Sequence, residues 1–465
     1  MKFGGTSVAD ADAIDRVARI VRREIDGRAD AAPPIVVVSA LAKVTDRLVD
    51  AARRAENGDG EGAVAALNEL LERHVAVTTA LTSGARRAET IAAVGEEFAG
   101  AVGLVRALAI LREVSPRSLD AVLAAGELAS SRIVASALAE RDIPAIWFDA
   151  RAIVVTDAEH TAAAPDTAGT CSRARATIGA AAGRGQVPIV GGFIGATAQG
   201  ITTTLGRGGS DYSAAILGAC VDAQEIQIWT DVDGMLTADP RLVDEPRLVR
   251  HLSFAEASEL AYFGAKVLHP STILPAVAKD IPVRIVNSHT PDAPGTLITK
   301  ETRRSDGELA AIACKRDVTV VDITSTRMLM AHGFLRRLFE VFERFKTAVD
   351  VVTTSEVSVS VTVDDTRRLD AIVDNLRSFA EVSREPDMGI VCVVGETLRA
   401  DATAFARAVD ALGSLPLRLV SQAASRRNVT FVLRDADVPD AMNRLHGAFF
   451  ESPAYHGPTT SERVV

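Results

Sequence analysis

The chain of 465 residues is long enough for two to four domains at roughly 100–200 residues each. Hydrophobic residues make up 48% and charged residues 24%, values that exclude a long disordered chain and a collagen-like one. A net charge of −10, an aromatic content of 4% and the lack of any basic run of five residues give no sign of a nucleic-acid partner.

The uncharged stretches and the cysteines predict a cytoplasmic protein rather than a membrane protein. The N-terminal sequence MKFGG has no apolar segment of the signal-peptide kind. Residues 185–206, the longest stretch without Asp, Glu, Lys or Arg, contain six glycines and make a poor membrane helix. The four cysteines are far apart and form no CxxC pair: Cys171, Cys220, Cys314 and Cys392. We expect each to be a small buried residue with a reduced thiol.

Helical and strand patterns alternate over the first 300 residues. Helical spacing of apolar residues predicts six helices: Ala9–Ile25, Asp46–Glu56, Gly62–Leu81, Arg86–Val114, Leu119–Glu140 and Asp211–Ala219. Short apolar runs predict four strands: Ile35–Ala40, Val187–Ile194, Glu225–Thr230 and Pro282–Val286. The alternation indicates an α/β domain over residues 1–300, with a parallel-rich open sheet sandwiched by helices.

The pattern changes after the turn-rich segment Pro291–Gly295, where an internal repeat begins. The first unit has βαββαβ order: Val318–Thr324, Gly333–Phe345, Val349–Thr354, Val357–Val363, Arg367–Phe379 and Ala380–Arg384. The second unit lacks the last strand: Ile390–Gly395, Ala402–Leu412, Leu415–Ser421, Val429–Arg434 and Val438–Phe450.

A strand pattern at Leu309–Lys315 precedes the first unit and has no partner there. We therefore expect it to cross over and complete the second sheet. The expected α+β units are residues 317–388 and, discontinuously, residues 306–316 plus 389–452. Residues 453–465 are expected to form a disordered tail.

Two glycine-rich segments each lead into a helical pattern. They are Lys2–Ser7 (KFGGTS) and Thr202–Asp211 (TTTLGRGGSD). Backbone N–H groups at a helix start attract anions, and Lys2 and Arg207 add positive charge. A tight structural turn is the alternative for the first segment, and a plain helix cap is the alternative for Asp211.

Three further segments carry charged groups. Trp229–Gly234 (WTDVDG) places Thr230 and Asp231 at the carboxyl end of a strand, where open α/β sheets bind ligands. Its loop continues to Arg241, and FGAKVLHP brings Lys266 toward the same edge. Glu127 lies among small apolar residues, which fits either a surface glutamate or a purposeful buried one. With no Walker loop, these segments predict phosphoryl transfer that depends on positioning and electrostatics.

Five motifs together resemble the aspartate kinase family, most closely its monofunctional, lysine-sensitive type. They are KFGGTSVAD, TTTLGRGGSDY, WTDVDGM with TADPR, FGAKVLHP and TTSEVSVSV, and the resemblance extends to about Phe450. It implies an amino-acid-kinase fold followed by two ACT domains. It also implies transfer of the γ-phosphoryl group of MgATP to the side-chain carboxylate of L-aspartate, giving 4-phospho-L-aspartate on the route to lysine, threonine and methionine.

The resemblance assigns roles to individual residues. The implied catalytic residues are Lys2, Asp211 and Lys266. The implied ATP-binding residues are Lys2, Phe3, Gly4, Gly5, Thr230, Asp231, Leu236, Arg241, Lys266 and Val267. The implied substrate-binding residues are Ser39, Thr45, Glu127 for the ammonium group and Arg207 for the α-carboxylate. No metal site made by the protein alone is implied, since Mg²⁺ comes with ATP.

The first ACT unit resembles the inhibitor-binding unit of the lysine-sensitive type. The matching positions are Met328, Ala331, Phe334, Leu335, Val349, Asp350, Ser355 and Glu356. Acidic Asp350 and Glu356 suit a cationic amino acid, so lysine is the implied inhibitor. Such sites form between ACT units of two subunits, which implies a homodimer, with a tetramer as the alternative. Three positions depart from the family: Lys43 replaces glycine, Leu236 replaces tyrosine and Ala331 replaces serine.

Two other functions fit parts of the pattern. One is another kinase of the same fold, acting on acetylglutamate, glutamate or UMP. The other is a non-catalytic amino-acid sensor with a relic kinase domain. The tandem ACT units and Glu127 argue against the first alternative. The intact residues Lys2, Arg207, Asp211 and Lys266 argue against the second.

Overall fold

The computed structural model describes residues 1–28, 31–264, 270–302, 308–325, 332–396, 398, 402–422 and 427–451. The chain forms two compact units. The first unit comprises Met1–Met235 and Val267–Lys300, and the second comprises Leu236–Lys266 and Glu301–Val465.

The main sheet of the first unit is largely parallel, as the alternation of strands and helices predicted. The seven strands that this unit contributes to the sheet run in the order β3-β5-β2-β1-β8-β10-β11, and of these seven described strands only β11 pairs antiparallel, with β10. Their bounds are β1 Lys2–Phe3, β2 Val36–Val38, β3 Ala145–Phe148, β5 Val187–Gly191, β8 Ile226–Thr230, β10 Val283–Asn287 and β11 Thr296–Thr299. A second small sheet joins β4 (Val155–Thr156), β6 (Ile194–Thr197) and β7 (Thr202–Thr204).

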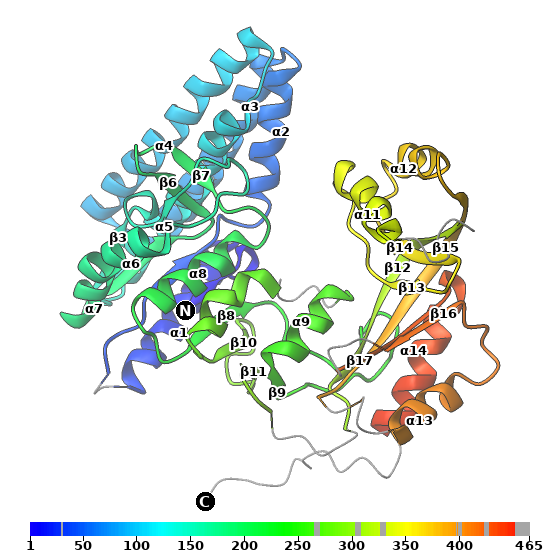
Figure 1. Cartoon of the computed structure of the whole chain (residues 1–465). Coiled ribbons are helices and arrows are strands. Elements are labelled where there is room, and N and C mark those ends of the chain that lie inside the picture. The colour runs from blue at the N-terminus through cyan, green and yellow to red at the C-terminus, as the bar shows by residue number, and fades with distance from the viewer. Residues whose placement is uncertain are drawn as a thin grey trace, which may run out of the picture. The chain divides into compact units, whose positions relative to one another are not determined.

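Long helices cover this sheet, and α3 and α4 lie side by side (Figure 1). The helices are α1 Ala11–Asp26, α2 Val44–Glu56, α3 Gly60–Leu81, α4 Gly84–Leu111, α5 Pro116–Glu140, α6 Thr167–Ala174, α7 Ala180–Gly183, α8 Gly209–Cys220 and α10 Leu274–Ala278. Among the described residues, α5 is long and apolar enough to cross a membrane by composition, but 83% of its most apolar window is buried. It is therefore a core helix of this unit, packed against β2, β3 and β5.

The second unit contains one antiparallel sheet shared by the two repeats. The strand order is β13-β14-β12-β15-β17-β16. The bounds are β12 Ala311–Thr324, β13 Val352–Thr354, β14 Ser358–Val363, β15 Glu381–Val394, β16 Leu419–Gln422 and β17 Asn428–Arg434. The helices α11 Phe334–Arg344 and α12 Leu369–Leu376 cover one repeat, and α13 Ala402–Leu412 and α14 Val438–His446 cover the other.

The expected crossover of Leu309–Lys315 is seen in the pairing of β12. Ala311 to Lys315 pair with Val394 to Ile390 of the second repeat, while Val321 to Thr324 pair with Arg384 to Glu381 of the first (Figure 1). The sequence predicted two separate strands, Leu309–Lys315 and Val318–Thr324, where the structure has the single strand β12. It likewise predicted two strands, Ala380–Arg384 and Ile390–Gly395, where the structure has the single strand β15. A register shift between Lys315 and Val318 absorbs the polar break that had suggested two strands.

The segment Leu236–Lys266, which contains β9 (His251–Ser253) and α9 (Phe254–Tyr262), packs with the second unit. Thr237 accepts a backbone hydrogen bond from Ile312, and Asn428 donates to the Glu259 carboxylate at 2.6 Å. The predicted catalytic domain over residues 1–300 stays a prediction. The sequence pattern placed Leu236–Lys266 in that domain, whereas the division into compact units places this segment in the second unit.

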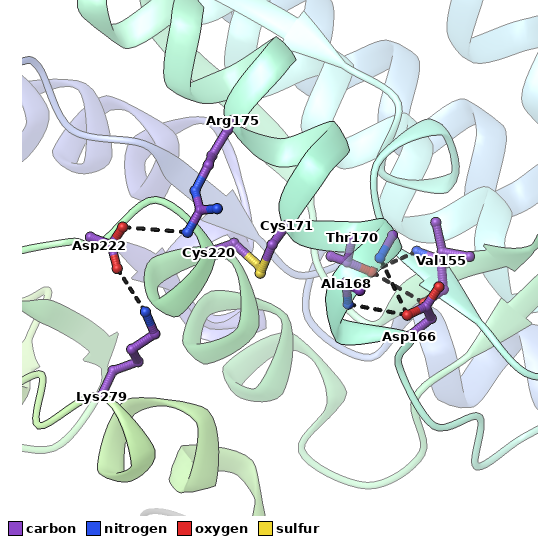
Figure 2. Close-up of a disulfide and its surroundings, with 10 residues drawn as sticks. Val155, Asp166, Ala168, Thr170, Cys171, Arg175, Cys220, Asp222 and Lys279 are labelled. Carbon is purple, nitrogen blue, oxygen red and sulfur yellow. Dashed lines mark hydrogen bonds and ion pairs between the residues drawn. A yellow bond between two sulfur atoms is a disulfide. The ribbon is translucent and has the colours of Figure 1, made fainter.

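The expectation of four reduced cysteines was wrong. Cys171 on α6 and Cys220 on α8 form a disulfide, as Figure 2 shows, with a Cα–Cα distance of 4.5 Å. The two residues are 49 positions apart, and only the packing of α6 against α8 brings them together. The sequence spacing therefore carried no sign of the pair. Cys392 is buried and Cys314 is half-buried, and both are free.

Candidate active site

Two of the three predicted catalytic residues, Lys2 and Asp211, lie together beside the central strand of the first unit. β1 lies between β2 and β8, at the point where the strand order changes direction, which is where open α/β sheets bind ligands. Lys2 is buried within β1, and its Nζ atom lies 2.7 Å from Oδ1 of Asp211. Asp211 stands in the first turn of α8, so the ion pair fixes the lysine beside a helix N-terminus.

A cavity of about 400 Å³ opens beside this ion pair. It is lined by Lys2, Gly5, Ser39, Ala40, Leu41, Ala42, Lys43, Thr45, Asp46, Glu127, Phe193, Gly206, Arg207, Gly208, Gly209, Ser210 and Asp211. The fold thus brings together seven of the predicted site residues from four chain segments. They are Lys2, Gly5, Ser39, Thr45, Glu127, Arg207 and Asp211.

Glu127 is the buried carboxylate of this cavity. It lies on α5 with only 2% of its surface exposed, and its Oε2 atom has no hydrogen-bond partner among the described residues. Burial raises the pKa of Glu127 from 4.5 to about 8, although the Ala40 backbone partly offsets this rise by hydrogen bonding. An unpartnered buried carboxylate is costly, so the position favours a cationic ligand group.

Arg207 provides the opposite charge in the same cavity. Its side chain is exposed and makes no hydrogen bond or ion pair with any residue that the structure describes. Gly206 and Gly208 on either side have φ values of +75° and +69°, a conformation that glycine adopts without strain. A guanidinium held this way can bind a carboxylate through two parallel hydrogen bonds.

Comparison with known proteins decides the family. The amino-acid kinase family profile matches residues 1–287, and an ACT domain profile matches residues 391–449. The lysine-sensitive aspartokinase 3 of Escherichia coli is 36% identical over 462 residues, covering 97% of this chain and 98% of the relative. The chloroplastic aspartokinase 3 of Arabidopsis thaliana is 36% identical over 469 residues, covering 97% and 81%. The chain belongs to the aspartokinase family.

Solved aspartokinase structures agree in fold. E. coli aspartokinase III in complex with aspartate and ADP (R-state) matches with a TM-score of 0.82 and 35% identity, covering 97% of this chain and 99% of that one. The same enzyme in complex with lysine and aspartate (T-state) matches with a TM-score of 0.80, covering 97% and 98%. The predicted fold class, an amino-acid-kinase domain followed by α+β ACT domains, is therefore confirmed.

The residues predicted for the nucleotide side of this aspartokinase are divided between the units. Thr230 ends β8 and donates a hydrogen bond to Asp231 at 3.2 Å. The Phe3 side chain is fully buried and stacks on Trp229, so only its backbone can face a ligand. Leu236 and Arg241 lie in the second unit, where Arg241 forms an ion pair with Asp239 at 2.6 Å. Lys266 and Val267 fall outside the described residues.

The predicted regulatory residues lie around α11 and β13. The Asp350 carboxylate is buried and its Oδ1 atom accepts from Lys315 at 2.8 Å, while its Oδ2 atom has no partner among the described residues. Phe334 packs edge-on against Phe379, and Ser355 and Ser358 share a hydrogen bond of 2.6 Å. Leu335 and Glu356 are exposed, and Val349 accepts from the Tyr262 hydroxyl at 3.3 Å. Met328 and Ala331 fall outside the described residues.

Sequence reasoning missed Phe193, which lines the cavity. The run Val187–Ile194 predicted one strand, but β5 ends at Gly191 and β6 begins at Ile194 in another sheet. The turn passes through Phe193, which has a φ of +66°. The adjacent pair Gly191–Gly192 was the available signal for this break.

We expect Gly192→Ala to lower kcat at least tenfold. A Cβ atom at Gly192 would lie 2.7 Å from Cβ and 2.8 Å from Cα of Ser210, so the first turn of α8 must move. That movement separates Asp211 from Lys2. Steady-state kinetics check this result against Gly103→Ala, because the Cβ position of Gly103 meets open space. Equal turnover in the two variants would contradict the expectation.

Proposed function

We propose that this aspartokinase transfers the γ-phosphoryl group of MgATP to the β-carboxylate of L-aspartate. The observation that carries the proposal is one cavity lined by Glu127, Arg207 and the Lys2–Asp211 ion pair. Among the described residues, the Oε2 atom of Glu127 and the guanidinium of Arg207 have no partner. An α-amino acid presents an ammonium to Glu127 and an α-carboxylate to Arg207. Its side-chain carboxylate then extends toward Lys2.

The described groups suit the charge changes of this reaction. An oxygen of the β-carboxylate attacks the γ-phosphorus, the bond from that phosphorus to the β–γ bridging oxygen breaks, and ADP leaves with the electron pair. No proton needs to move, so the protein needs no general base. Lys2 and the N-terminus of α8 supply positive charge beside the cavity, and we assign to them the stabilisation of negative charge on the transferred group.

MgATP fits the donor set of the site. Among the described residues, no cluster of three or more His, Cys, Asp or Glu side chains could hold a metal by itself. We assign the Mg²⁺ ligands chiefly to the ATP phosphates, as is usual for this ion in phosphoryl-transfer enzymes, and we assign Lys2, Gly4 and Gly5 to the transferred phosphoryl group. The ion would neutralise phosphate charge.

A substrate panel tests the proposal. ADP release is measured with L-aspartate, L-glutamate, N-acetyl-L-glutamate and UMP at equal concentration. We expect aspartate to give the highest kcat/KM, since Glu127 needs a free ammonium that N-acetyl-L-glutamate and UMP lack. Turnover of N-acetyl-L-glutamate without turnover of aspartate would replace this proposal with the first alternative, and no turnover of any substrate would favour the sensor.

We further propose that the catalytic domain spans residues 1–300 and that two ACT domains span 317–388 and, together, 306–316 and 389–452. The pairing of β12 with β15 supports the discontinuous second ACT domain. A homodimer through the ACT domains and a cytoplasmic location complete the proposal. The location is supported by the nucleotide substrate.

Lysine is the effector that we propose for the first ACT domain. The buried Asp350, whose Oδ2 atom has no hydrogen-bond partner assigned among the described residues, and the exposed Glu356 offer acidic groups to the two ammonium groups of lysine. The relatives support this choice, because E. coli aspartokinase III has been crystallised with lysine and aspartate.

We expect lysine to inhibit the wild type and Glu356→Ala to raise the half-inhibitory lysine concentration at least tenfold. Loss of one charge-assisted hydrogen bond accounts for an effect of this size. Inhibition curves with lysine, threonine and methionine measure it, with the exposed Glu340→Ala as a control on α11. Inhibition by threonine alone would contradict the assignment.

A further inference from the structure

A second buried carboxylate on α5 has no part in the proposed chemistry. Asp120 is fully buried and lies seven residues before Glu127 on the same helix. A spacing of seven residues places both side chains on one face of a helix. Asp120 is not among the residues that line the cavity.

Asp120 accepts hydrogen bonds from two other chain segments. Its Oδ1 atom accepts from the Thr204 hydroxyl at 2.6 Å, and its Oδ2 atom accepts from Nδ1 of His160 at 2.7 Å. The backbone N–H of Thr161 donates to both oxygens at 3.1 Å. One carboxylate therefore joins α5, the loop that contains His160 and Thr161, and the end of β7.

The contact with Thr204 bears directly on Arg207. Thr204 is the last residue of β7, and Leu205 and Gly206 are all that separate it from Arg207. The same turn is held by a hydrogen bond from Ala163 to the Thr204 carbonyl at 2.9 Å. At Gly206 a Cβ atom would lie 3.1 Å from the Thr161 carbonyl oxygen, so the loop packs closely against this segment.

We propose that Asp120 is a positioning residue that sets the separation between Glu127 and Arg207. α5 carries Glu127 and β7 leads into Arg207, and Asp120 is bonded to the β7 end through Thr204. Because both of these groups hold the α-amino acid end of the substrate, this inference rests on the proposed function. It identifies Asp120, Thr204 and His160 as determinants of affinity for that end.

The physical basis is the rigidity of a satisfied buried network. A carboxylate in a protein interior stays charged only when hydrogen bonds replace its lost water, and each bond then restricts the element that donates it. Removing one donor leaves the helix and the strand able to move apart. A displacement of about 1 Å at the substrate groups is enough to reduce binding strongly.

The test compares two neighbouring threonines. Thr204→Val removes the hydroxyl that bonds Asp120, whereas Thr203→Val removes an equally buried hydroxyl that bonds Thr156 at 2.7 Å instead. We expect Thr204→Val to raise KM for L-aspartate about tenfold, with kcat and KM for ATP changed less than twofold. Thr203→Val should change all three parameters less than twofold.

A substrate fragment separates positioning from a general structural role. 3-Aminopropanoate keeps the ammonium and the acceptor carboxylate but lacks the α-carboxylate that Arg207 would bind. We expect its inhibition constant against aspartate to be unchanged in Thr204→Val, because the displaced arginine is not used. An equal rise in KM for aspartate and in this inhibition constant would overturn the proposal.

A second variant, His160→Ala, keeps the test decisive. The melting temperature of each variant shows whether it is folded under the assay conditions. If Thr204→Val is unfolded at the assay temperature, His160→Ala removes a different bond to the same carboxylate and should raise KM for aspartate at least threefold. Unchanged KM in His160→Ala would then overturn the inference. If the wild type does not phosphorylate aspartate, the proposed function fails. If it does and Thr204→Val equals Thr203→Val, only the role of Asp120 fails.

Discussion

Replacing Lys2 by methionine should lower kcat for aspartate phosphorylation about 100-fold, with a smaller change in KM for aspartate. Methionine keeps an unbranched side chain that is one heavy atom shorter, and it removes the charge. Removal of one preorganised charge from a phosphoryl-transfer site reduces stabilisation of the transition state by about 2.7 kcal/mol, which corresponds to this factor. The measurement is initial-rate ADP release at saturating MgATP.

A related expected result concerns Asp211, the ion-pair partner of Lys2. The Lys2 ammonium lies 2.7 Å from the Asp211 carboxylate, and both side chains are at most 15% exposed. Asp211→Asn leaves the lysine in place but frees it to rotate, so we expect a loss of at least tenfold in kcat. Lys279→Met is the matched control, because Lys279 pairs with Asp222 at the protein surface (Figure 2). Near-normal turnover in Lys2→Met would contradict the assignment.

The second large effect concerns Glu127 and depends on pH. Burial raises its pKa to about 8, so below this pH the free enzyme holds a proton that must leave before Glu127 can pair with an ammonium. We expect KM for aspartate to fall about tenfold per pH unit from pH 6 toward 8 and to level off above 8. Glu127→Gln should raise KM about 100-fold at pH 8 and remove the pH dependence. A flat wild-type profile would contradict the role of Glu127.

The same residue makes a prediction about stability, with a definite sign. The pKa of Glu127 is about 8 in the folded chain against 4.5 for an ordinary glutamate, so between these values the folded state holds a proton that the unfolded state has lost. The free energy of unfolding should therefore decrease as pH rises from 4.5 to 8, by at most about 1.4 kcal/mol per pH unit. Glu127→Gln has no proton to lose at this position, so this decrease in the free energy of unfolding is absent. The measurement is urea unfolding at pH 6 and pH 8. The free energy of unfolding of Glu127→Gln, relative to that of the wild type, should be higher at pH 8 than at pH 6.

Local patterns predicted individual helices and strands well where the element has one apolar face or one continuous apolar run. The β-branched run Ile35–Ala40 contains β2, and the apolar spacing of Ala9–Ile25 matches α1. Continuity was harder to predict, because it depends on partners distant in the sequence. β12 stays a single strand through Lys315 and Val318 since β15 pairs along nearly all of it.

Individual residues of the candidate site could be predicted only where they lie within recognisable sequence motifs. Glu127 alone could not be told from a surface glutamate, because the sequence does not show that its neighbour Gly126 packs closely against Val44 and Leu48 of α2. Asp120 gave no signal at all, since its partners come from a loop and a strand that the sequence does not connect to α5. The disulfide between Cys171 and Cys220 escaped prediction for the same reason.

The most direct test of the central claim is detection of the acyl phosphate. The purified full chain is incubated with MgATP, L-aspartate and hydroxylamine, which converts a carboxyl phosphate to a stable hydroxamate. We predict aspartate β-hydroxamate in amounts equal to the ADP formed, and about 100-fold slower formation of both products when Lys2 is replaced by methionine. ADP release that needs no aspartate, or that leaves no hydroxamate, would contradict phosphoryl transfer to the aspartate carboxylate.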